Sequence, residues 1–234
     1  MALPHIDVPV YTTQLPSTGE VIKFRPFLVR EQKQLLIAQN AGIEQQTQAV
    51  LDVVDTCTYN KLPVAKLPAY DIEYLFLQLR THSVGESIDL VLTCGECENK
   101  QETKLDLTTV KVDKPVDHER NVDLGNGLVL TMQDPNLEVI NALRSQTELT
   151  ADVIIAVIAE CIHTIWKGDE SYAAVEYTAA ERIEFVENLS PANLERLEQY
   201  FVTMPRLRHV LDFTCSKCNK ENSAAMEGLQ SFFG

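Results

Sequence analysis

Four cysteines form two short pairs that lie far apart in the chain, and together they could bind a metal ion. The first pair is Cys94-Gly95-Glu96-Cys97 and the second is Cys215-Ser216-Lys217-Cys218. A C-x-x-C spacing lets two thiolates from one tight turn face the same point, and Zn²⁺ prefers four soft ligands at the corners of a tetrahedron. The sequence therefore predicts a structural zinc site whose ligands are Cys94, Cys97, Cys215 and Cys218. Two local disulfides or four free thiols are the alternatives.

A site with four cysteine ligands has no open coordination position, whereas catalytic zinc usually keeps one for water or substrate. We therefore expect the zinc to hold structure and not to perform catalysis. Between Cys97 and Cys215 lie 117 residues. A crosslink across a loop of that length destabilises the unfolded chain by roughly 4–5 kcal/mol on the chain-entropy model. Zinc binding in small fingers contributes roughly 10–16 kcal/mol to folding, so the predicted site would fix the late strands beside the middle ones.

Motifs of other chemistries are absent from the sequence. It contains no glycine-rich phosphate loop, nucleophile elbow, HExxH motif or dinucleotide fingerprint. The five histidines are scattered and never form a metal pair at helical spacing. Cys57 lies on a predicted apolar helix face, which favours a buried packing thiol over a reactive one. We therefore expect no catalytic residue, no cofactor-binding residue beyond the zinc ligands, no small-molecule substrate and no enzyme activity.

The composition is that of an acidic globular protein. The chain has 234 residues with a net charge of −14, enough for one large domain or two small ones. Such a surface would repel phosphate backbones, which argues against nucleic acid as a partner. A zinc-ribbon adaptor for nucleic acid or transcription machinery is the alternative function. No stretch approaches the roughly 20 apolar residues of a membrane helix, and the first residues lack the features of a secretory signal, so we expect a cytosolic protein without a membrane partner.

The elements that must position the cysteines can be read from the hydrophobic pattern. Each pair follows an apolar, strand-like run (residues 88–92 and 209–213) and precedes a polar turn. Residues 5–28 alternate in part at period two and predict β structure. Apolar residues at spacings of three and four predict seven helices elsewhere. These are expected over about 30–42, 44–59, 69–82, 135–143, 151–166, 178–189 and 190–204.

Three local signals sharpen this assignment. Gly125-Asn126-Gly127 between two apolar runs predicts a hairpin. Asp134 before Pro135 predicts a helix N-cap, and Thr178 with Glu181 predicts a capping box.

The whole pattern predicts an α+β fold, with a mostly helical body, an N-terminal β segment and a zinc-ribbon-like β lobe built from two distant C-x-x-C knuckles. We expect four segments in one compact domain or two tightly packed lobes. They are 1–83 (N-terminal β segment and helices), 84–132 (β region with the first knuckle), 133–206 (helical block) and 207–234 (second knuckle and C-terminal tail).

Several stretches, taken together and in order, resemble the baseplate hub proteins of T-even-like contractile-tailed bacteriophages. The likeness covers nearly the whole chain and is strongest in the first hundred residues and the last twenty-five. The stretches that carry it are residues 15–19, 24–31, 35–38, 71–80, 83–86 and 213–233.

The resemblance implies a structural subunit or assembly protein of the phage baseplate hub, which contacts other baseplate and tail hub proteins. It implies a location in the virion tail baseplate, in the host cytoplasm during assembly, or in both, and it supplies no catalytic residue. The C-terminal residues Leu229, Phe232 and Phe233 could insert into a partner pocket. Alternatively, they could cover the protein's own zinc lobe.

Overall fold

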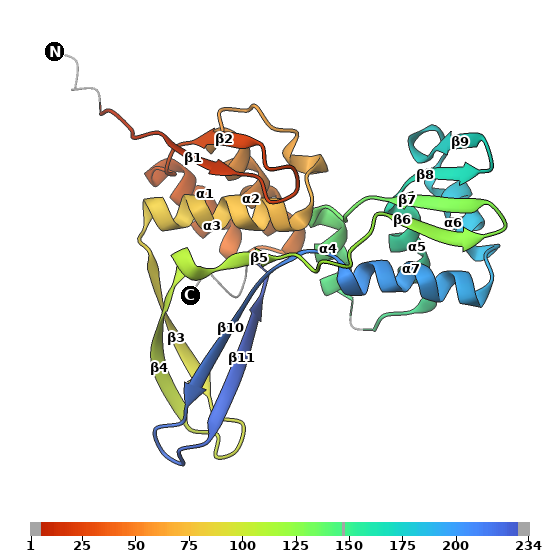
Figure 1. Ribbon diagram of the computed structural model, residues 1–234. Coiled ribbons are helices and arrows are strands. Elements are labelled where there is room, and N and C mark those ends of the chain that lie inside the picture. The colour runs from red at the N-terminus through yellow and green to blue at the C-terminus, as the bar shows by residue number, and fades with distance from the viewer. Residues whose placement is uncertain (1–5, 147, 229–234) are drawn as a thin grey trace. The chain divides into compact units, whose positions relative to one another are not determined.

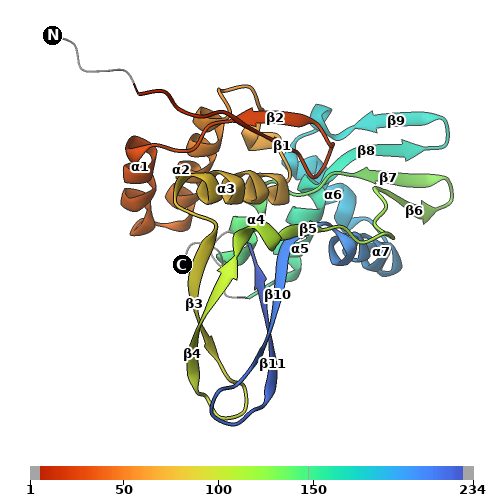
Figure 2. The ribbon, with the colours of Figure 1, turned by 60° about the vertical axis from the view of Figure 1, so that its left-hand side comes forward.

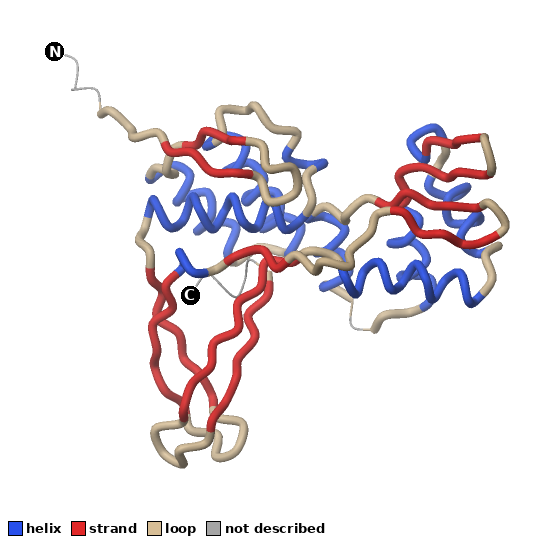
Figure 3. Tube along the Cα trace, viewed as in Figure 1, coloured by secondary structure: helices blue, strands red, loops and turns tan. Residues whose placement is uncertain are grey.

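The computed structural model describes residues 6–146 and 148–228, and the contacts of the chain divide it into two units (Figure 1). Unit 1 combines Met1–Asp113 with Arg206–Gly234, and unit 2 is Lys114–Pro205. Unit 2 is therefore an insertion between two stretches of unit 1. Both units contain helices and antiparallel strands (Figure 3), in agreement with the predicted α+β class.

The first part of unit 1 is a β hairpin followed by helices. These elements are β1 (Tyr11–Gln14), β2 (Val21–Phe24), α1 (Val29–Gln39), α2 (Ile43–Cys57), the 3-10 helix η1 (Val64–Lys66) and α3 (Ala69–Ser83). The apolar stripes predicted for α2 and α3 are buried, and Val53, Val54 and Ile72 have no exposed surface. The predicted β segment is shorter than expected, because residues 6–10 form no strand. Pro9 has no backbone N–H to donate to a partner strand.

The second part of unit 1 contains two long hairpins. They are formed by β3 (Ser87–Thr93) with β4 (Lys100–Asp106), and by β10 (Arg206–Thr214) with β11 (Glu221–Glu227). The short strand β5 (Lys111–Asp113), which follows the 3-10 helix η2 (Leu107–Thr109), pairs with the beginning of β10. Strand β5 was not predicted, because residues 110–120 are polar and their pattern is irregular. We call the two hairpins together the arm, because both extend away from α1–α3 and converge at their turns (Figures 1 and 2).

Side chains alternate between the inner and outer faces of the arm. At the base, near α3, an apolar cluster joins both hairpins to the helix; its buried members include Leu77, Ile88, Leu105, Leu207 and Met226. Towards the turns the half-buried positions of β4 and β11 become small or polar, namely Gln101, Thr103, Asn222 and Ala224. Towards the cysteine turns the apolar side chains between the hairpins therefore come from β3 and β10, such as Leu92 and Phe213, and no longer from β4 and β11.

Unit 2 is a four-stranded antiparallel sheet with helices. The strands, in spatial order, are β6 (Asn121–Gly125), β7 (Leu128–Met132), β8 (Ile162–Lys167) and β9 (Glu170–Ala173). The helices are α4 (Leu137–Arg144), α5 (Ala151–Glu160), the 3-10 helix η3 (Ala174–Glu176), α6 (Ala179–Glu187) and α7 (Pro191–Thr203). Leu130 and Leu197 are fully buried in a core shared by the sheet and α5, α6 and α7.

Two of the local signals are confirmed in unit 2. The predicted hairpin is β6–β7, where Asn126 and Gly127 have φ of 53° and 71°. A two-residue hairpin turn of this hand needs positive φ at both central residues, which Asn-Gly tolerates. The capping box is present at α6, where the Thr178 side chain accepts a hydrogen bond from the Glu181 backbone N–H and Glu181 bonds back to Thr178.

The helix predicted over 151–166 is wrong in its second half. Helix α5 ends at Glu160, Cys161 caps it, and residues 162–167 form strand β8 between β7 and β9. A continuous apolar run does not distinguish a buried helix from a buried strand. The β-branched and aromatic residues of Ile162-His163-Thr164-Ile165-Trp166 favour a strand, and pairing with β7 decides between the two. Strand β9 was likewise unpredicted, and the region expected to be a helical block contains half of a sheet.

Asp134 is not the N-cap of α4, because Asn136 takes that place and accepts the Val139 backbone N–H. The Asp134 carboxylate is instead buried, where it accepts hydrogen bonds from the Tyr200 hydroxyl at 2.7 Å and from Arg120 at 3.3 Å. His118 Nε2 lies 3.4 Å from the same carboxylate. Asp134 therefore ties the loop before β6 to α7.

The C-terminal residues Leu229, Phe232 and Phe233 lie outside the described residues. Within residues 6–146 and 148–228, every helix is too short or too polar to cross a membrane.

Candidate metal centre

The two cysteine turns are built in the same way. Residues 94–99 connect β3 to β4 and residues 215–220 connect β10 to β11, so each turn has six residues. In the first turn, Cys94 N–H donates to Asn99 O at 2.9 Å and Glu98 N–H donates to Cys94 O at 3.0 Å. In the second turn, Cys215 and Lys220 repeat the first of these bonds at 2.9 Å, and Asn219 and Cys215 repeat the second at 3.0 Å.

The residue after each pair makes the tight turn possible. Glu98 has φ of 56° and Asn219 has φ of 57°, both in the left-handed region. This conformation reverses the chain directly after the second cysteine and returns it to the partner strand. Within each turn the first sulfur also accepts a backbone N–H at 3.4 Å, from Glu96 to Cys94 and from Lys217 to Cys215. The first sulfur of each pair is therefore held by its own turn before any ligand arrives.

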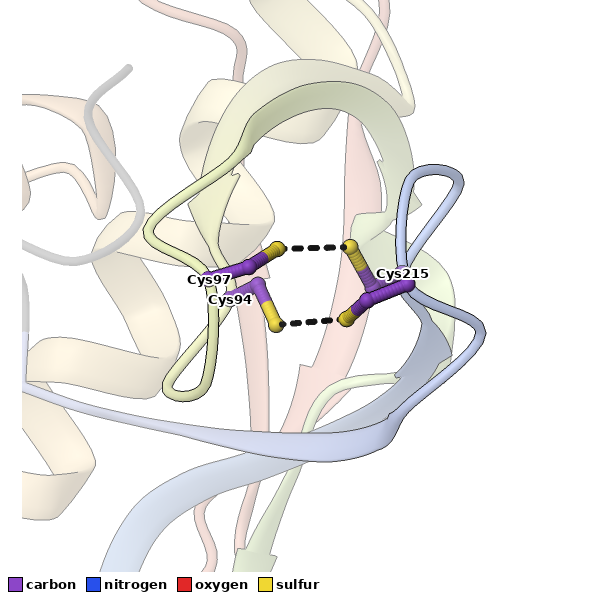
Figure 4. A group of neighbouring side chains, drawn as sticks. Cys94, Cys97 and Cys215 are labelled. Atoms are coloured by element: carbon purple, nitrogen blue, oxygen red, sulfur yellow. Dashed lines mark hydrogen bonds between the residues drawn. The ribbon is translucent and has the colours of Figure 1, made fainter.

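The ends of the two hairpins bring all four sulfurs together. Cys94 Sγ lies 3.7 Å from Cys218 Sγ, and Cys97 Sγ lies 3.6 Å from Cys215 Sγ (Figure 4). All four sulfurs lie within 4.8 Å of one another. Among the residues that the structure describes, this is the one group of three or more histidine, cysteine and acidic side chains arranged to hold a metal ion.

These spacings fit a metal better than a disulfide. A disulfide requires its sulfurs at about 2.0 Å, and the close contacts run between the two turns and not within each pair. A tetrahedral ion with metal–sulfur bonds of about 2.3 Å places its sulfurs about 3.8 Å apart. The sequence reasoning thus selected four side chains that the fold brings together across the arm, and the arrangement could bind a metal.

Backbone dipoles favour thiolates at the first cysteine of each pair. The N–H groups of Cys97 and Glu96 lower the pKa of Cys94 to about 6. The corresponding N–H groups of Cys218 and Lys217 lower the pKa of Cys215. At Cys218 the Lys220 N–H acts in the same direction, but the neighbouring sulfurs, Cys97 foremost, outweigh it and raise the pKa to about 12. A bound cation offsets such repulsion and displaces the remaining protons.

Two amide side chains fasten the turns to each other, and we call Gln101 and Asn222 the amide latch. Gln101 Oε1 accepts the backbone N–H of Ser216 at 2.9 Å, and Asn222 Oδ1 accepts that of Gly95 at 3.1 Å. Ser216 and Gly95 hold the same position in their turns, so the two bonds are reciprocal. Asn222 Nδ2 also donates to Cys94 Sγ at 3.5 Å, whereas Gln101 Nε2 donates to Thr214 O at 3.2 Å.

The comparison with protein families gives one match that covers almost the whole chain. The model of the family described as T4 bacteriophage base plate protein matches residues 8–234. The chain belongs to this family. No curated protein and no solved structure matches it. The match confirms the resemblance to T4-like baseplate proteins that the motifs had indicated, and it points to a structural protein of the virion tail.

In this baseplate-family chain the latch is the part of the site that sequence reasoning missed. Its signal was present, because Gln101 and Asn222 each stand four residues after the second cysteine of a pair. An amide side chain at that position can have several roles. Its role here is clear only from the structure, in which the two turns lie opposite each other. Cys57, in contrast, is buried as predicted, and burial raises the pKa of its thiol to about 11.

Proposed function

We propose that this chain is a structural subunit or assembly protein of the baseplate hub of a contractile-tailed phage. It acts through contacts with other baseplate and tail hub proteins, without enzyme activity, a small-molecule substrate or a membrane. The family match over residues 8–234 is the observation that carries the proposal. The net charge of −14 favours protein partners over nucleic acid. Its location is the virion tail baseplate, reached from the host cytoplasm in which tails assemble.

We further propose that Zn²⁺ is the ion of the cysteine centre, bound by Cys94, Cys97, Cys215 and Cys218. The all-sulfur donor set favours a soft ion with tetrahedral preference and disfavours Mg²⁺ or Ca²⁺, which prefer oxygen. A closed shell of four thiolates supports a structural role. Cys94 and Cys215, whose thiolates the backbone already favours, are suited to be the first ligands.

The ion's role is to hold the end of the arm together. The apolar cluster that joins the hairpins to α3 lies at their base, whereas nearer the turns β4 and β11 contribute only Gln101, Thr103, Asn222 and Ala224 to the inner face. Side chains of this size and polarity contribute little hydrophobic stabilisation. The metal and the amide latch supply the missing cohesion, so that the arm offers a rigid surface to a tail partner.

Mass spectrometry of purified virions and of tail intermediates tests the assignment to the baseplate. We expect the chain in at least one tail complex, and deletion of its gene should prevent the assembly of normal tails. Absence from every tail complex together with normal tails after deletion would contradict the proposal. A salt-dependent shift of DNA or RNA by the purified protein would then favour the adaptor function.

Metal analysis of the purified full-length protein tests the zinc assignment. We expect one zinc per chain, removed by a strong chelator and absent after Cys94→Ser with Cys215→Ser. A folded protein with a zinc content near zero would show that the cysteines are thiols or hold another ion.

A further inference from the structure

Trp166, the single tryptophan of the chain, lies on one face of the unit 2 sheet. The strand register places Asp123, Val129, Trp166 and Ser171 side by side in one row across β6, β7, β8 and β9. Leu130 and Ile165, the next residues along their strands, belong to the core. Because successive side chains point to opposite faces of a strand, the Trp166 row lies on the face opposite the core. The Trp166 side chain is accordingly exposed, with 43% of its surface accessible.

Hydrogen bonds hold this exposed indole in place. Trp166 Nε1 donates to Thr131 Oγ1 at 3.0 Å, and Thr131 Oγ1 donates to Asn121 Oδ1 at 2.8 Å. The chain of bonds crosses from β8 over β7 to β6 and fixes the indole across the sheet. A side chain ordered before binding loses little conformational entropy on association. Tryptophan is also enriched among the residues that contribute most to protein interfaces.

The net charge of unit 2 indicates which kind of partner fits this face. Unit 2 holds 6 Lys and Arg against 16 Asp and Glu, a net charge of −10, whereas the rest of the chain holds 14 against 18, a net charge of −4. The exposed carboxylate of Asp123 stands in the same row as Trp166. A second copy of this chain would be repelled. A basic segment would be attracted, with an arginine over the indole and an ion pair to Asp123.

We propose that this sheet face binds a basic segment of another baseplate protein, with Trp166 as the apolar anchor and Asp123 as the charge partner. The identity of the partner as a tail protein rests on the proposed function. The preference for a basic segment rests on the face itself and on the charge of unit 2.

A peptide titration of the full-length protein tests the chemistry of the face. The probe is a decapeptide of alternating arginine and threonine, and the signal is the fluorescence of Trp166. We expect a saturable change in emission that weakens as salt is raised, and no change with the peptide that carries glutamate in place of arginine. Equal responses to both peptides, or to neither, would overturn the proposal. A response to maltoheptaose with none to the basic peptide would assign the face to carbohydrate instead.

Variants separate a specific site from general attraction to an acidic protein. By calorimetry we expect Trp166→Thr to weaken peptide binding about tenfold or more, and Asp123→Asn about threefold. Glu184→Gln is the matched control, since it removes one negative charge from an exposed position on α6. Binding to that variant should stay within about twofold of the wild type. Equal losses from Asp123→Asn and Glu184→Gln would overturn the proposal, as would a lower melting temperature for Trp166→Thr.

Tails assembled with the variant protein complete the test. Trp166→Thr should keep its zinc content and melting temperature but enter tails at a reduced level. Wild-type and variant protein found in tails at the same level would overturn this inference and leave the baseplate role intact. Wild-type protein absent from tails would instead count against the proposed function.

Discussion

The end of the arm and the core of unit 2 hold antiparallel strands together by different means. In unit 2 one face of the sheet is covered by helices, and Leu130, Ile158, Ile162 and Leu197 are buried at its centre. At the end of the arm two hairpins meet through four sulfurs and the amide latch, and of the apolar side chains there Leu92 is buried and Phe213 is half-buried. A long, thin element relies less on burial, because it has less interior to remove from water. We therefore expect different treatments to unfold the two regions.

Removal of the proposed zinc ion is expected to have the largest effect, and only on the arm. Chelation, or Cys94→Ser with Cys215→Ser, should unfold the end of the arm, because zinc binding in small domains contributes roughly 10–16 kcal/mol. Hydrogen exchange should show loss of amide protection in β3, β4, β10 and β11. The β6–β9 sheet of unit 2 is the internal control and should keep its protection. Equal loss in both units would mean that the centre stabilises the whole chain.

A cavity in the unit 2 core should give the reverse pattern. Leu130→Ala removes a side chain with no exposed surface and should lower the free energy of unfolding of unit 2 by about 2–5 kcal/mol. Denaturant unfolding monitored by Trp166 fluorescence measures this loss. Zinc content should remain that of the wild type. Val175→Ala, at an exposed residue, is the control and should change stability little.

Lowering the pH should reveal a further contribution to the stability of the fold, from Glu31 in the helices of unit 1. Burial alone would raise the pKa of Glu31, but hydrogen bonds from Arg25, Arg30 and the Leu28 backbone lower it to about 2. A lowered native pKa stabilises the fold above the unfolded pKa of about 4.5, and this stability is lost as pH falls towards 2. The shift corresponds to about 3 kcal/mol at neutral pH.

Glu31→Gln should therefore lower the stability at pH 7 and flatten its dependence on pH between about 5 and 2. Urea unfolding of both proteins across this range is the measurement. Exposed Glu20→Gln serves as the control and should follow the wild-type curve. Parallel curves for wild type and Glu31→Gln would show that the ion pair contributes nothing to the pH dependence.

Removal of the amide latch should have the smallest effect of these changes. Asn222→Ala with Gln101→Ala should weaken zinc binding about tenfold to a hundredfold, as is typical for groups that orient metal ligands. Competition with a chromophoric chelator measures the affinity, and the Co²⁺-substituted protein should keep a four-thiolate spectrum. Glu102→Ala, on the outer face of β4 beside Gln101, is the control. An unchanged affinity in the double variant would reduce the latch to a packing contact.

The candidate site could be predicted from the sequence because the type and spacing of its cysteines are recognisable without the structure. C-x-x-C turns after strand-like runs identify thiolate pairs, and two pairs identify a closed shell. The helices of unit 1 were predictable for a similar reason, since their apolar residues follow a period that only one backbone conformation satisfies. Residues 151–166 were not predictable in this way. Their mostly apolar run suits a buried helix or a buried strand, and pairing of Ile162–Lys167 with β7 and β9 decides between them.

The sequence was enough to predict the four cysteines, the strand-like runs that precede them, the acidic charge and the family, but not strand β11, which completes the second hairpin. Tertiary structure alone decided that residues 114–205 form a unit of their own, inserted between β5 and β10. It also decided that Gln101 and Asn222 face each other's turns, and that Trp166 lies on an open sheet face. The physical reason is that ligand type and local periodicity are properties of neighbouring residues. Strand pairing, the facing of two turns and the face of a sheet are set by partners far away in the chain.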